Sequence, residues 1–423
     1  MMNELKPYEN SFNKVYGTDE KVLKFQFKRY SDLIEKHSEY FGPKDVYLFS
    51  TPGRTEIGGN HTDHNHGRVL AASINLDSIA VVSKNNESKV TLYSEGFDKP
   101  FVVDLNNLSP IKDEEGDTNS LIRGIAARFV ELGYKIGGFN GVITSEVLRG
   151  SGLSSSASIE VLIGTIFNAL YNRESIPVEK IAKISQHAEN VYFGKPCGLM
   201  DQMACAVGGI ITIDFEDEEN PIVERVEFDF EATGYNLIVV DTGGTHADLT
   251  DDYALIPNEM KSVANYFGKS FCREIDYTSV VENISELRYK LGDRAVLRAI
   301  HFLQENERVV QQVEALRNNS FNEFLVLIKE SGNSSFKWLQ NIYSATDIKE
   351  QGLTLALAIT EKYLAEIGEG ACRVHGGGFA GTIQVFLPSN KIEEYQKQME
   401  NIFGEKCVSK LFIRKIGAYH FKN

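Results

Sequence analysis

A glycine- and serine-rich turn that leads directly into a long helix is the feature that most constrains the fold of this chain. The turn, RGSGLSSSA, occupies residues 149–157 and is called the phosphate turn below. One helical face collects the apolar side chains that follow it: Ile159, Leu162, Ile163, Ile166, Phe167 and Leu170. This spacing predicts a half-buried helix whose first N–H groups point into the turn.

Such a turn suits the binding of a phosphate group. Glycines let the backbone approach an anion closely, the positive end of the helix dipole stabilises it, and serine hydroxyls can bind phosphate oxygens or magnesium. The turn lacks the G-K-[ST] ending of a Walker loop, which disfavours a P-loop nucleotidase. A serine-capped helix without any ligand is the structural alternative.

Length and composition indicate a globular protein with two domains. The chain has 423 residues, of which 42% are hydrophobic, and we place the domain boundary at residue 225, giving units 1–225 and 226–423. A net charge of −15 argues against nucleic acid or an anionic membrane as the main partner. Five scattered cysteines without a C-x-x-C pair, together with no signal peptide or membrane span, favour the cytoplasm.

The hydrophobic pattern predicts alternating strands and helices, hence an α+β or α/β architecture. The predicted strands are 46–50, 89–93, 101–105, 141–147, 210–215, 223–230, 235–240, 382–387 and 410–416. Besides the helix after the phosphate turn, helices are predicted at 121–132, 253–267, 295–316, 354–367 and 392–403.

A second glycine-rich segment, residues 52–67, concentrates hydrogen-bonding side chains in a predicted loop. A carboxylate such as Asp63 can accept hydrogen bonds from two neighbouring sugar hydroxyls, and Arg54 can neutralise a phosphoryl group in transfer. The segment therefore predicts polyol recognition. Two alternatives remain, namely a polar surface loop and a zinc or iron centre with the ligands His61, Asp63, His64 and His66.

A third glycine-rich segment, residues 375–381, formally matches G-x-G-x-x-G. The match precedes a predicted strand instead of a helix, and no acidic residue follows at the Rossmann position. We interpret it as close backbone packing beside a ligand, with a simple turn before a strand as the alternative.

Taken together, these segments resemble the GHMP kinases, and galactokinase in particular. Residues 52–54 followed by 61–63 resemble the galactokinase signature, residues 152–158 its phosphate loop and residues 376–381 its third motif. Residues 196–202 are similar to its catalytic aspartate segment, and Asp241-Thr242 with His246 and Tyr253 to a later sugar-binding stretch. The resemblance implies an α+β fold with an N-terminal domain like ribosomal protein S5 domain 2 and a C-terminal ferredoxin-like domain.

The resemblance also implies ATP-dependent phosphorylation of the anomeric hydroxyl of galactose, with Mg²⁺, by a monomer or weak homo-oligomer. Asp201 would deprotonate or orient that hydroxyl, and Arg54 would be the cation beside it. Ser156 and Glu189 would hold magnesium. The sugar would be bound by Glu56, Asn60, His61, Asp63 and Tyr253, with Gly376, Gly377 and Gly378 packed beside the ligand. ATP would be bound by Gly150, Ser151, Gly152, Leu153, Ser154, Ser155, Ser156 and Ala157.

The first motif departs from the family pattern. Asn60 stands where the family has a glutamate that accepts from the sugar C6 hydroxyl, Glu56 stands at a usual asparagine, and His64 at a usual tyrosine. These exchanges leave galacturonate or N-acetylgalactosamine as alternative substrates. Two further functions stay open, namely a GHMP kinase for another metabolite and a non-catalytic sensor of sugar and ATP. The intact Ser156-Ala157 step favours catalysis over the sensor.

Overall fold

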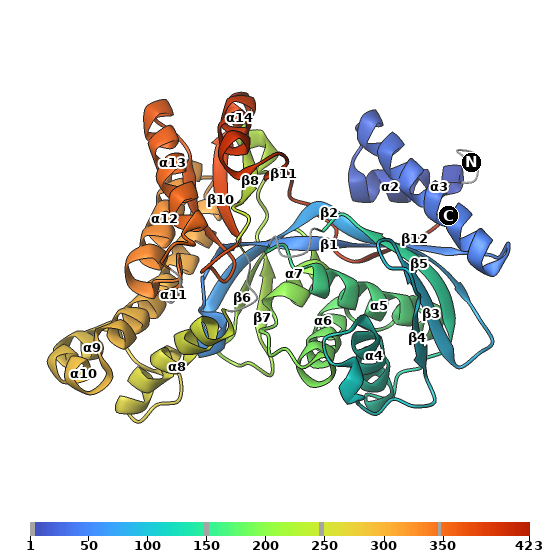
Figure 1. Cartoon of the computed structure of the whole chain (residues 1–423), viewed down its shortest axis with the longest axis horizontal. Coiled ribbons are helices and arrows are strands. Elements are labelled where there is room, and N and C mark those ends of the chain that lie inside the picture. The colour runs from blue at the N-terminus through green and yellow to red at the C-terminus, as the bar shows by residue number, and fades with distance from the viewer. Residues whose placement is uncertain (1–4, 148–151, 245–248, 346–347) are drawn as a thin grey trace.

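The computed structural model describes residues 5–147, 152–244, 249–345 and 348–423, which form two β-sheets with helices packed around them (Figure 1). The larger sheet has the strand order β12-β1-β2-β5-β3-β4, and β6 and β7 extend it beside β2. Its strands are β1 (Tyr47–Gly58), β2 (Arg68–Lys84), β3 (Lys89–Ser94), β4 (Phe101–Asp104), β5 (Phe139–Ser145), β6 (Ile210–Asp214), β7 (Ile222–Arg225) and β12 (Tyr419–Phe421).

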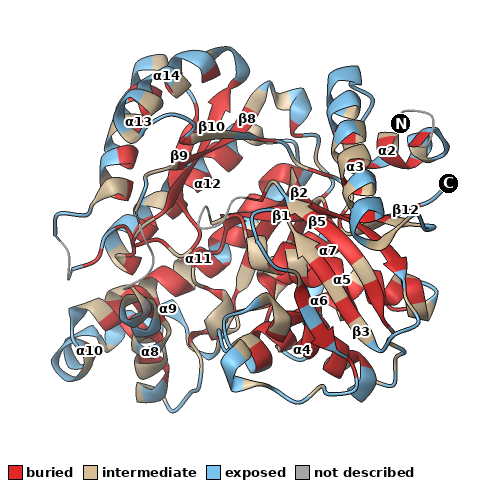
Figure 2. Cartoon of the chain, turned by 45° about the vertical axis from the view of Figure 1, so that its right-hand side comes forward, coloured by how far each residue is buried: buried red, intermediate tan, exposed pale blue. Residues whose placement is uncertain are grey.

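Helices cover both faces of this sheet because the buried side chains of its strands alternate. In β2, Ala80 and Val82 point into one core and Ile79 and Val81 into another. The first core is closed by α4 (Thr118–Glu131), α5 (Ser155–Asn172), α6 (Val178–Ala188) and α7 (Met200–Val207), and the second by α2 (Glu9–Tyr16) and α3 (Glu20–Phe41). Figure 2 shows the buried residues concentrated in these layers.

The smaller sheet is antiparallel, with the order β11-β8-β10-β9. Its strands are β8 (Tyr235–Asp241), β9 (Ala371–His375), β10 (Thr382–Pro388) and β11 (Val408–Leu411). The helices of this half are α8 (Thr250–Tyr266), α9 (Tyr277–Glu282), α10 (Ile284–Leu291), α11 (Asp293–Arg317), α12 (Phe321–Ser334), α13 (Gly352–Ile367) and α14 (Ile392–Phe403). One hydrophobic core joins Ile57 and Leu70 of the large sheet to Leu237 of the small sheet and to Val309 of α11, so this core fixes the two sheets relative to each other.

The predicted strands and helices occur in the predicted order, although β9, α6, α7, α9, α10 and α12 were not predicted, and three further points differ. Residues 52–58, predicted as loop, continue strand β1, because two register shifts absorb the Pro52-Gly53 turn signal without ending the pairing with β2. The predicted strands 223–230 and 410–416 end earlier, at Arg225 and Leu411. Strand β2 was not predicted, because its run of buried residues on both faces gives no clear alternation.

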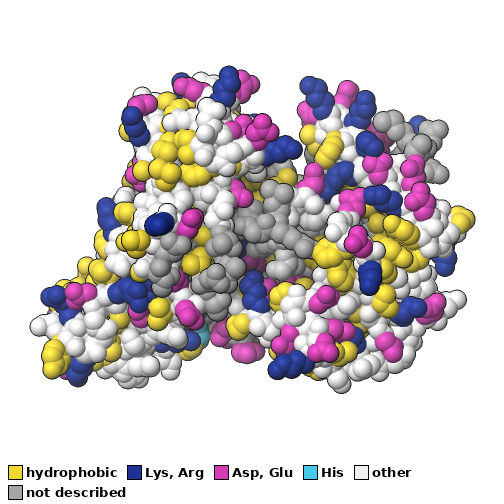
Figure 3. Space-filling view, in the orientation of Figure 1, with side chains coloured by type: hydrophobic (Ala, Val, Ile, Leu, Met, Phe, Trp, Pro, Cys, Tyr) yellow, Lys and Arg dark blue, Asp and Glu magenta, His cyan; other side chains and the backbone are white. Residues whose placement is uncertain are grey.

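The chain returns to the large sheet at its C-terminal end. Strand β12 pairs with β1, and Ile413 bridges to Ile74 of β2. The division at residue 225 stays a prediction, and Ile413 and residues 419–421 pair with strands of the first sheet. No helix in the described part of the chain is long and apolar enough to cross a membrane. On the face that Figure 3 shows, basic and acidic side chains of the described residues are interspersed.

Candidate active site

Arg54 and Asp201 form a two-pronged ion pair at the centre of the site. Arg54 lies on β1 and Asp201 in the first turn of α7. Arg54 Nε donates to Asp201 Oδ1 at 2.6 Å, and Nη2 donates to Oδ2 at 2.7 Å. The Arg54 side chain is 8% exposed and that of Asp201 29% exposed, so solvent reaches the carboxylate better than the guanidinium. The two predicted catalytic residues therefore lie together, with the carboxylate accessible.

The phosphate turn is attached to this ion pair. Arg54 Nη1 donates to the carbonyl of Gly152, the Ser154 hydroxyl donates to Asp201, and Arg54 N donates to Leu153 O at 3.1 Å. A Cβ on Gly53 would lie 2.9 Å from Leu153 O, so glycine permits this close approach of β1 to the turn.

Ser154 itself has a φ of 58°, an uncommon conformation for serine that is typical of functional turns. Ser155, Ser156 and Ala157 begin α5, as predicted. Gly150 and Ser151, as well as His246 of the later stretch, lie outside the described residues.

The ion pair keeps Asp201 charged. Burial opposes ionisation of this carboxyl, but the Arg54 charge and the hydrogen bonds from Arg54 and Ser154 outweigh burial and lower the pKa of Asp201 below its ordinary value. Asp201 is thus an ionised hydrogen-bond acceptor and a weak base in this arrangement.

Ser156 and Glu189, the predicted magnesium ligands, also lie together. Ser156 Oγ donates to Glu189 Oε1 at 3.2 Å, and the Lys195 ammonium lies 3.4 Å from the same oxygen. Lys195 therefore marks a position beside Glu189 where a cation is favoured. A hydroxyl and a carboxylate are hard oxygen ligands of the kind magnesium takes, usually with the remaining ligands from water and phosphate. These residues fit a magnesium ion.

A buried glutamine that the sequence interpretation gave no role holds Glu189 in place. Gln202 Nε2 donates to Glu189 Oε2 at 2.8 Å and to Glu160 Oε2 at 3.0 Å. Glu160 has no exposed surface, and burial followed by the charge of Glu189 raises the pKa of Glu160 well above its ordinary value. The signal for Glu160 was an acidic residue on an otherwise apolar stretch of α5.

A loop of residues 59–67, called the histidine loop, lies between the ion pair and the small sheet. His61 and His64 are in contact, Nδ1 to Nε2 at 3.1 Å, and the other ring nitrogen of His61 lies 2.8 Å from Gly377 O. Burial and then the neighbouring His64 lower the pKa of His61 to about 3, so His61 is neutral. A Cβ on Gly198 would lie 2.1 Å from Asp63 Oδ2, which places Asp63 against the segment that leads into Asp201.

Asn60 and Glu56 lie beneath the site. Asn60 has no exposed surface: its Nδ2 donates to Glu56 Oε1 at 3.0 Å and to Gly376 O at 2.7 Å, while its Oδ1 accepts from Ser335 and Asn341. Glu56 Oε1 also accepts from Arg373 Nη2 at 2.7 Å. The prediction of a direct sugar contact is therefore corrected for Asn60, since protein groups use its donors and its acceptor, and Glu56 is a buried ion-pair partner.

The third glycine motif packs against the histidine loop and α8. Tyr253 donates its hydroxyl to Gly378 O at 2.8 Å, and a Cβ on Gly377 would lie 2.7 Å from the Tyr253 ring. The carbonyls of Gly376 and Gly377 accept from Asn60 and His61. Glycine is required at position 377, where a Cβ would meet the Tyr253 ring, and at position 378, where φ is 82° and a Cβ would meet Asn341 O. The three carbonyls of the motif support the predicted sugar-binding residues. No dinucleotide-type helix follows, since the motif leads into β10.

The alternative of a metal centre in the histidine loop is not supported. Within the described ranges, no group of three or more His, Cys, Asp or Glu side chains has a geometry that could hold a metal ion. His66 instead stacks on Phe271, with ring centroids 3.7 Å apart.

Comparisons with known proteins define first the class and then the family. A profile for the GHMP kinases N terminal domain matches residues 120–209, and the galactokinase galactose-binding signature matches residues 35–84. Galactokinase from Glaesserella parasuis is 30% identical over 370 residues, covering 86% of this chain and 90% of the relative. The crystal structure of Lactococcus lactis galactokinase complexed with galactose has a TM-score of 0.78 and 25% identity, covering 93% of this chain and 100% of that chain.

The mevalonate kinase of Methanococcus jannaschii shares the fold alone, with a TM-score of 0.62 and 18% identity over 88% of this chain and 99% of that chain. The protein is therefore a kinase with the α+β GHMP fold, as the sequence predicted. Within that class, the chain belongs to the galactokinase family of sugar kinases.

Proposed function

We propose that this protein transfers the γ-phosphoryl group of ATP to the C1 hydroxyl of galactose, giving galactose 1-phosphate and ADP. The observation that carries the proposal is the Arg54–Asp201 pair, which is bonded to the phosphate turn through Ser154 and Gly152 O. This connection puts a hydroxyl-orienting carboxylate and a charge-neutralising cation beside the N-terminus of α5. Family membership and the likeness to a galactokinase crystallised with galactose support the choice of sugar.

The proposed roles follow from the charges. Phosphoryl transfer through a loose transition state depends mainly on positioning and on neutralising charge. Asp201 accepts a hydrogen bond from the C1 hydroxyl of the sugar. This hydrogen bond orients the hydroxyl oxygen toward the γ-phosphorus of ATP. Arg54, held in place by Asp201 and by Gly152 O, offsets charge on the transferring group. Asp63 and His61 bind further hydroxyls from the histidine loop.

The N–H groups at the start of α5 and the hydroxyls of Ser155 and Ser156 would hold the phosphates of ATP. Ser156 and Glu189 would hold magnesium, with Gln202 fixing the carboxylate. Magnesium, when bound, offsets the charge of the β- and γ-phosphate oxygens. All five cysteines are free, in keeping with work in the reducing cytoplasm, which we propose as its location.

The substrate proposal is tested with purified protein, Mg-ATP and a sugar panel, measuring ADP release and the phosphorylated product. We expect galactose 1-phosphate as the main product and loss of turnover in Asp201→Asn. Asp98→Asn, at an exposed loop, is the matched control and should keep full activity. Turnover of galactose by Asp201→Asn at the wild-type rate would contradict the assigned role of Asp201.

Galacturonate and N-acetylgalactosamine are second candidate substrates. The observation that favours them is the buried amide at position 60, where the family has a carboxylate, together with the neutral His61. A carboxylate repels a galacturonate C6 group, whereas these neutral groups do not. Turnover of galacturonate above that of galactose in the same panel would replace our first choice. Binding of galactose and ATP without turnover of any sugar would indicate the sensor.

A further inference from the structure

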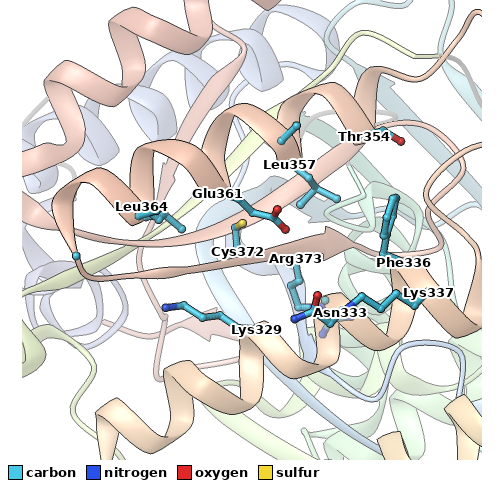
Figure 4. A pocket seen from close by; sticks show the side chains of 14 residues that line it. Lys329, Asn333, Phe336, Lys337, Thr354, Leu357, Glu361, Leu364, Cys372 and Arg373 are labelled. Atoms are coloured by element: carbon cyan, nitrogen blue, oxygen red, sulfur yellow. The ribbon is translucent and has the colours of Figure 1, made fainter.

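A cavity of about 570 Å³ lies in the small-sheet half, between α12, α13 and the edge strand β9. Figure 4 shows β9 crossing the cavity, α13 on one side and α12 on the other. None of its lining residues belongs to the Arg54–Asp201 pair, the phosphate turn or the histidine loop. Its volume is that of a small-molecule site.

Two lining residues have buried polar atoms that lack a hydrogen-bond partner among the described residues. These atoms are Arg373 Nε and Thr354 Oγ1. Arg373 is fully buried, and its other guanidinium nitrogens donate to Ile57 O and Glu56 Oε1. Buried polar atoms of this kind are normally paired, so the hydrogen bonding in this wall of the cavity is incomplete.

The charges of the cavity have a definite arrangement. Lys329 and Lys337 line the α12 side, and neither has an ion-pair partner in the described part of the chain. Glu361 of α13 faces them across β9, as Figure 4 shows. Two lysines and an unpaired Arg373 N–H favour an anionic group, while a carboxylate favours a group that donates hydrogen bonds.

We propose that this cavity binds a small phosphorylated polyol, such as a sugar phosphate. Its phosphate lies near Lys329 and Lys337 and its hydroxyls donate to Glu361. Lysine is a common phosphate ligand, and vicinal hydroxyls suit a carboxylate acceptor. Phosphate alone would leave Glu361 unused, and a neutral sugar would leave the lysines unused.

The same ligand would be coupled to the sugar site through Arg373. The Arg373 guanidinium connects the cavity wall to Glu56, Glu56 accepts from Asn60, and Asn60 donates to Gly376 of the third glycine motif. A ligand in the cavity that shifts the buried Arg373 side chain therefore acts on the network beneath the histidine loop. Coupling between two sites is reciprocal, so galactose would change the affinity for the phosphorylated polyol by the same factor. This second part rests on the proposed function, whereas binding in the cavity does not.

Calorimetric titration tests the binding. The wild-type protein, with saturating galactose to occupy the sugar site, is titrated with galactose 1-phosphate, glucose 6-phosphate and glycerol 3-phosphate, with inorganic phosphate as the comparison ligand. We expect one site per chain for at least one ester, at least tenfold tighter than inorganic phosphate. The double variant Lys329→Ala/Lys337→Ala should weaken that binding at least tenfold, and Glu361→Gln should remove the preference over inorganic phosphate. Both lysines are exposed, so these variants should fold.

The matched control is Lys362→Ala, an exposed lysine of α13 outside the cavity lining, which should bind as the wild type does. No binding of any ester by wild-type protein, or unchanged binding by the double lysine variant, would overturn the site. The coupling is measured separately, as the shift in galactose KM with the bound ester. If an ester binds in the cavity but the protein has no galactokinase activity, the proposed function is wrong and the proposed cavity site is still supported.

Discussion

Replacing Asn60 by the family glutamate should destabilise this protein, although the change restores the usual motif. Asn60 Nδ2 is 3.0 Å from Glu56 Oε1, and both side chains are buried. A second carboxylate at about 4 Å from Glu56 costs about 4 kcal/mol at an effective dielectric constant of about 20. Protonation of one carboxyl limits this cost, and burial already raises the pKa of Glu56. Loss of the donor to Gly376 O adds about 1–3 kcal/mol. We expect a total of about 3–5 kcal/mol at neutral pH.

The exchange of both residues should recover much of that loss. Glu56→Asn/Asn60→Glu keeps one amide and one carboxylate in contact, so the double-mutant cycle should show a favourable coupling of about 2–3 kcal/mol. The assay is urea unfolding of both single variants, the double variant and the exposed control Asn322→Glu. A cost for Asn60→Glu below about 1 kcal/mol, or additivity of the two changes, would refute the buried-pair reasoning.

Three further predictions concern single residues. Asp201→Asn should lower kcat about 10²- to 10⁴-fold, with a smaller effect on galactose KM, because orientation of the hydroxyl is lost in the transition state. Steady-state ADP release measures both kcat and KM. A change in KM alone would contradict this role of Asp201. Glu189→Gln should raise the Mg²⁺ concentration for half-maximal activity at least about tenfold in a magnesium titration, whereas an unchanged requirement would remove Glu189 from the metal site. Asp77→Ala should cost about 3–5 kcal/mol in urea unfolding, because the buried Arg414 loses its carboxylate partner and Arg29 keeps only its ion pair with Glu146. Burial opposes ionisation of Asp77, but the two arginines lower its pKa below the ordinary value, so its contribution is present above about pH 4 and is lost as pH falls through the lowered pKa. The wild type should therefore lose more stability than the variant below about pH 4, and equal losses would argue against the ion pairs.

Local sequence patterns predicted the elements of this fold better than its connections. The helix at residues 392–403 was predicted because its apolar periodicity is strong, and the helix after the phosphate turn because apolar side chains recur at helical spacing along it. Strand β1 was shortened because Pro52-Gly53 is a turn signal, and only the pairing with β2 shows that bulges absorb it. Pairing of β12 with β1 joins residues more than 350 positions apart, which local pattern cannot reveal.

In the candidate site, too, the parts that carry a sequence motif were predicted and the contacts between distant segments were not. The approach of Arg54, Asp201 and the phosphate turn was inferred from three separated motifs, and the structure brings them together. The burial of Asn60 was not foreseen, because its partners Ser335 and Asn341 come from a distant part of the chain with no motif of their own. Because Asn60 is a polar residue in a recognised motif, it was predicted to contact the ligand. Its tertiary contacts instead bury it beneath the site, where it supports the third glycine motif.

The low pKa of Asp201 bears on how the C1 hydroxyl is activated. An aspartate paired on both oxygens by Arg54 is a weaker base than a free one, so early removal of the hydroxyl proton is disfavoured. A loose transition state has little bond formation to the nucleophile, and the hydroxyl becomes strongly acidic only as the new P–O bond forms. A weak but well-placed acceptor is then sufficient. Arg54 also bonds to Gly152 O of the phosphate turn, so a movement of Arg54 toward a bound phosphoryl group would loosen its hold on Asp201 and raise the basicity of that carboxylate. The ion pair therefore favours an orienting role for Asp201 before transfer and proton acceptance only late in the reaction.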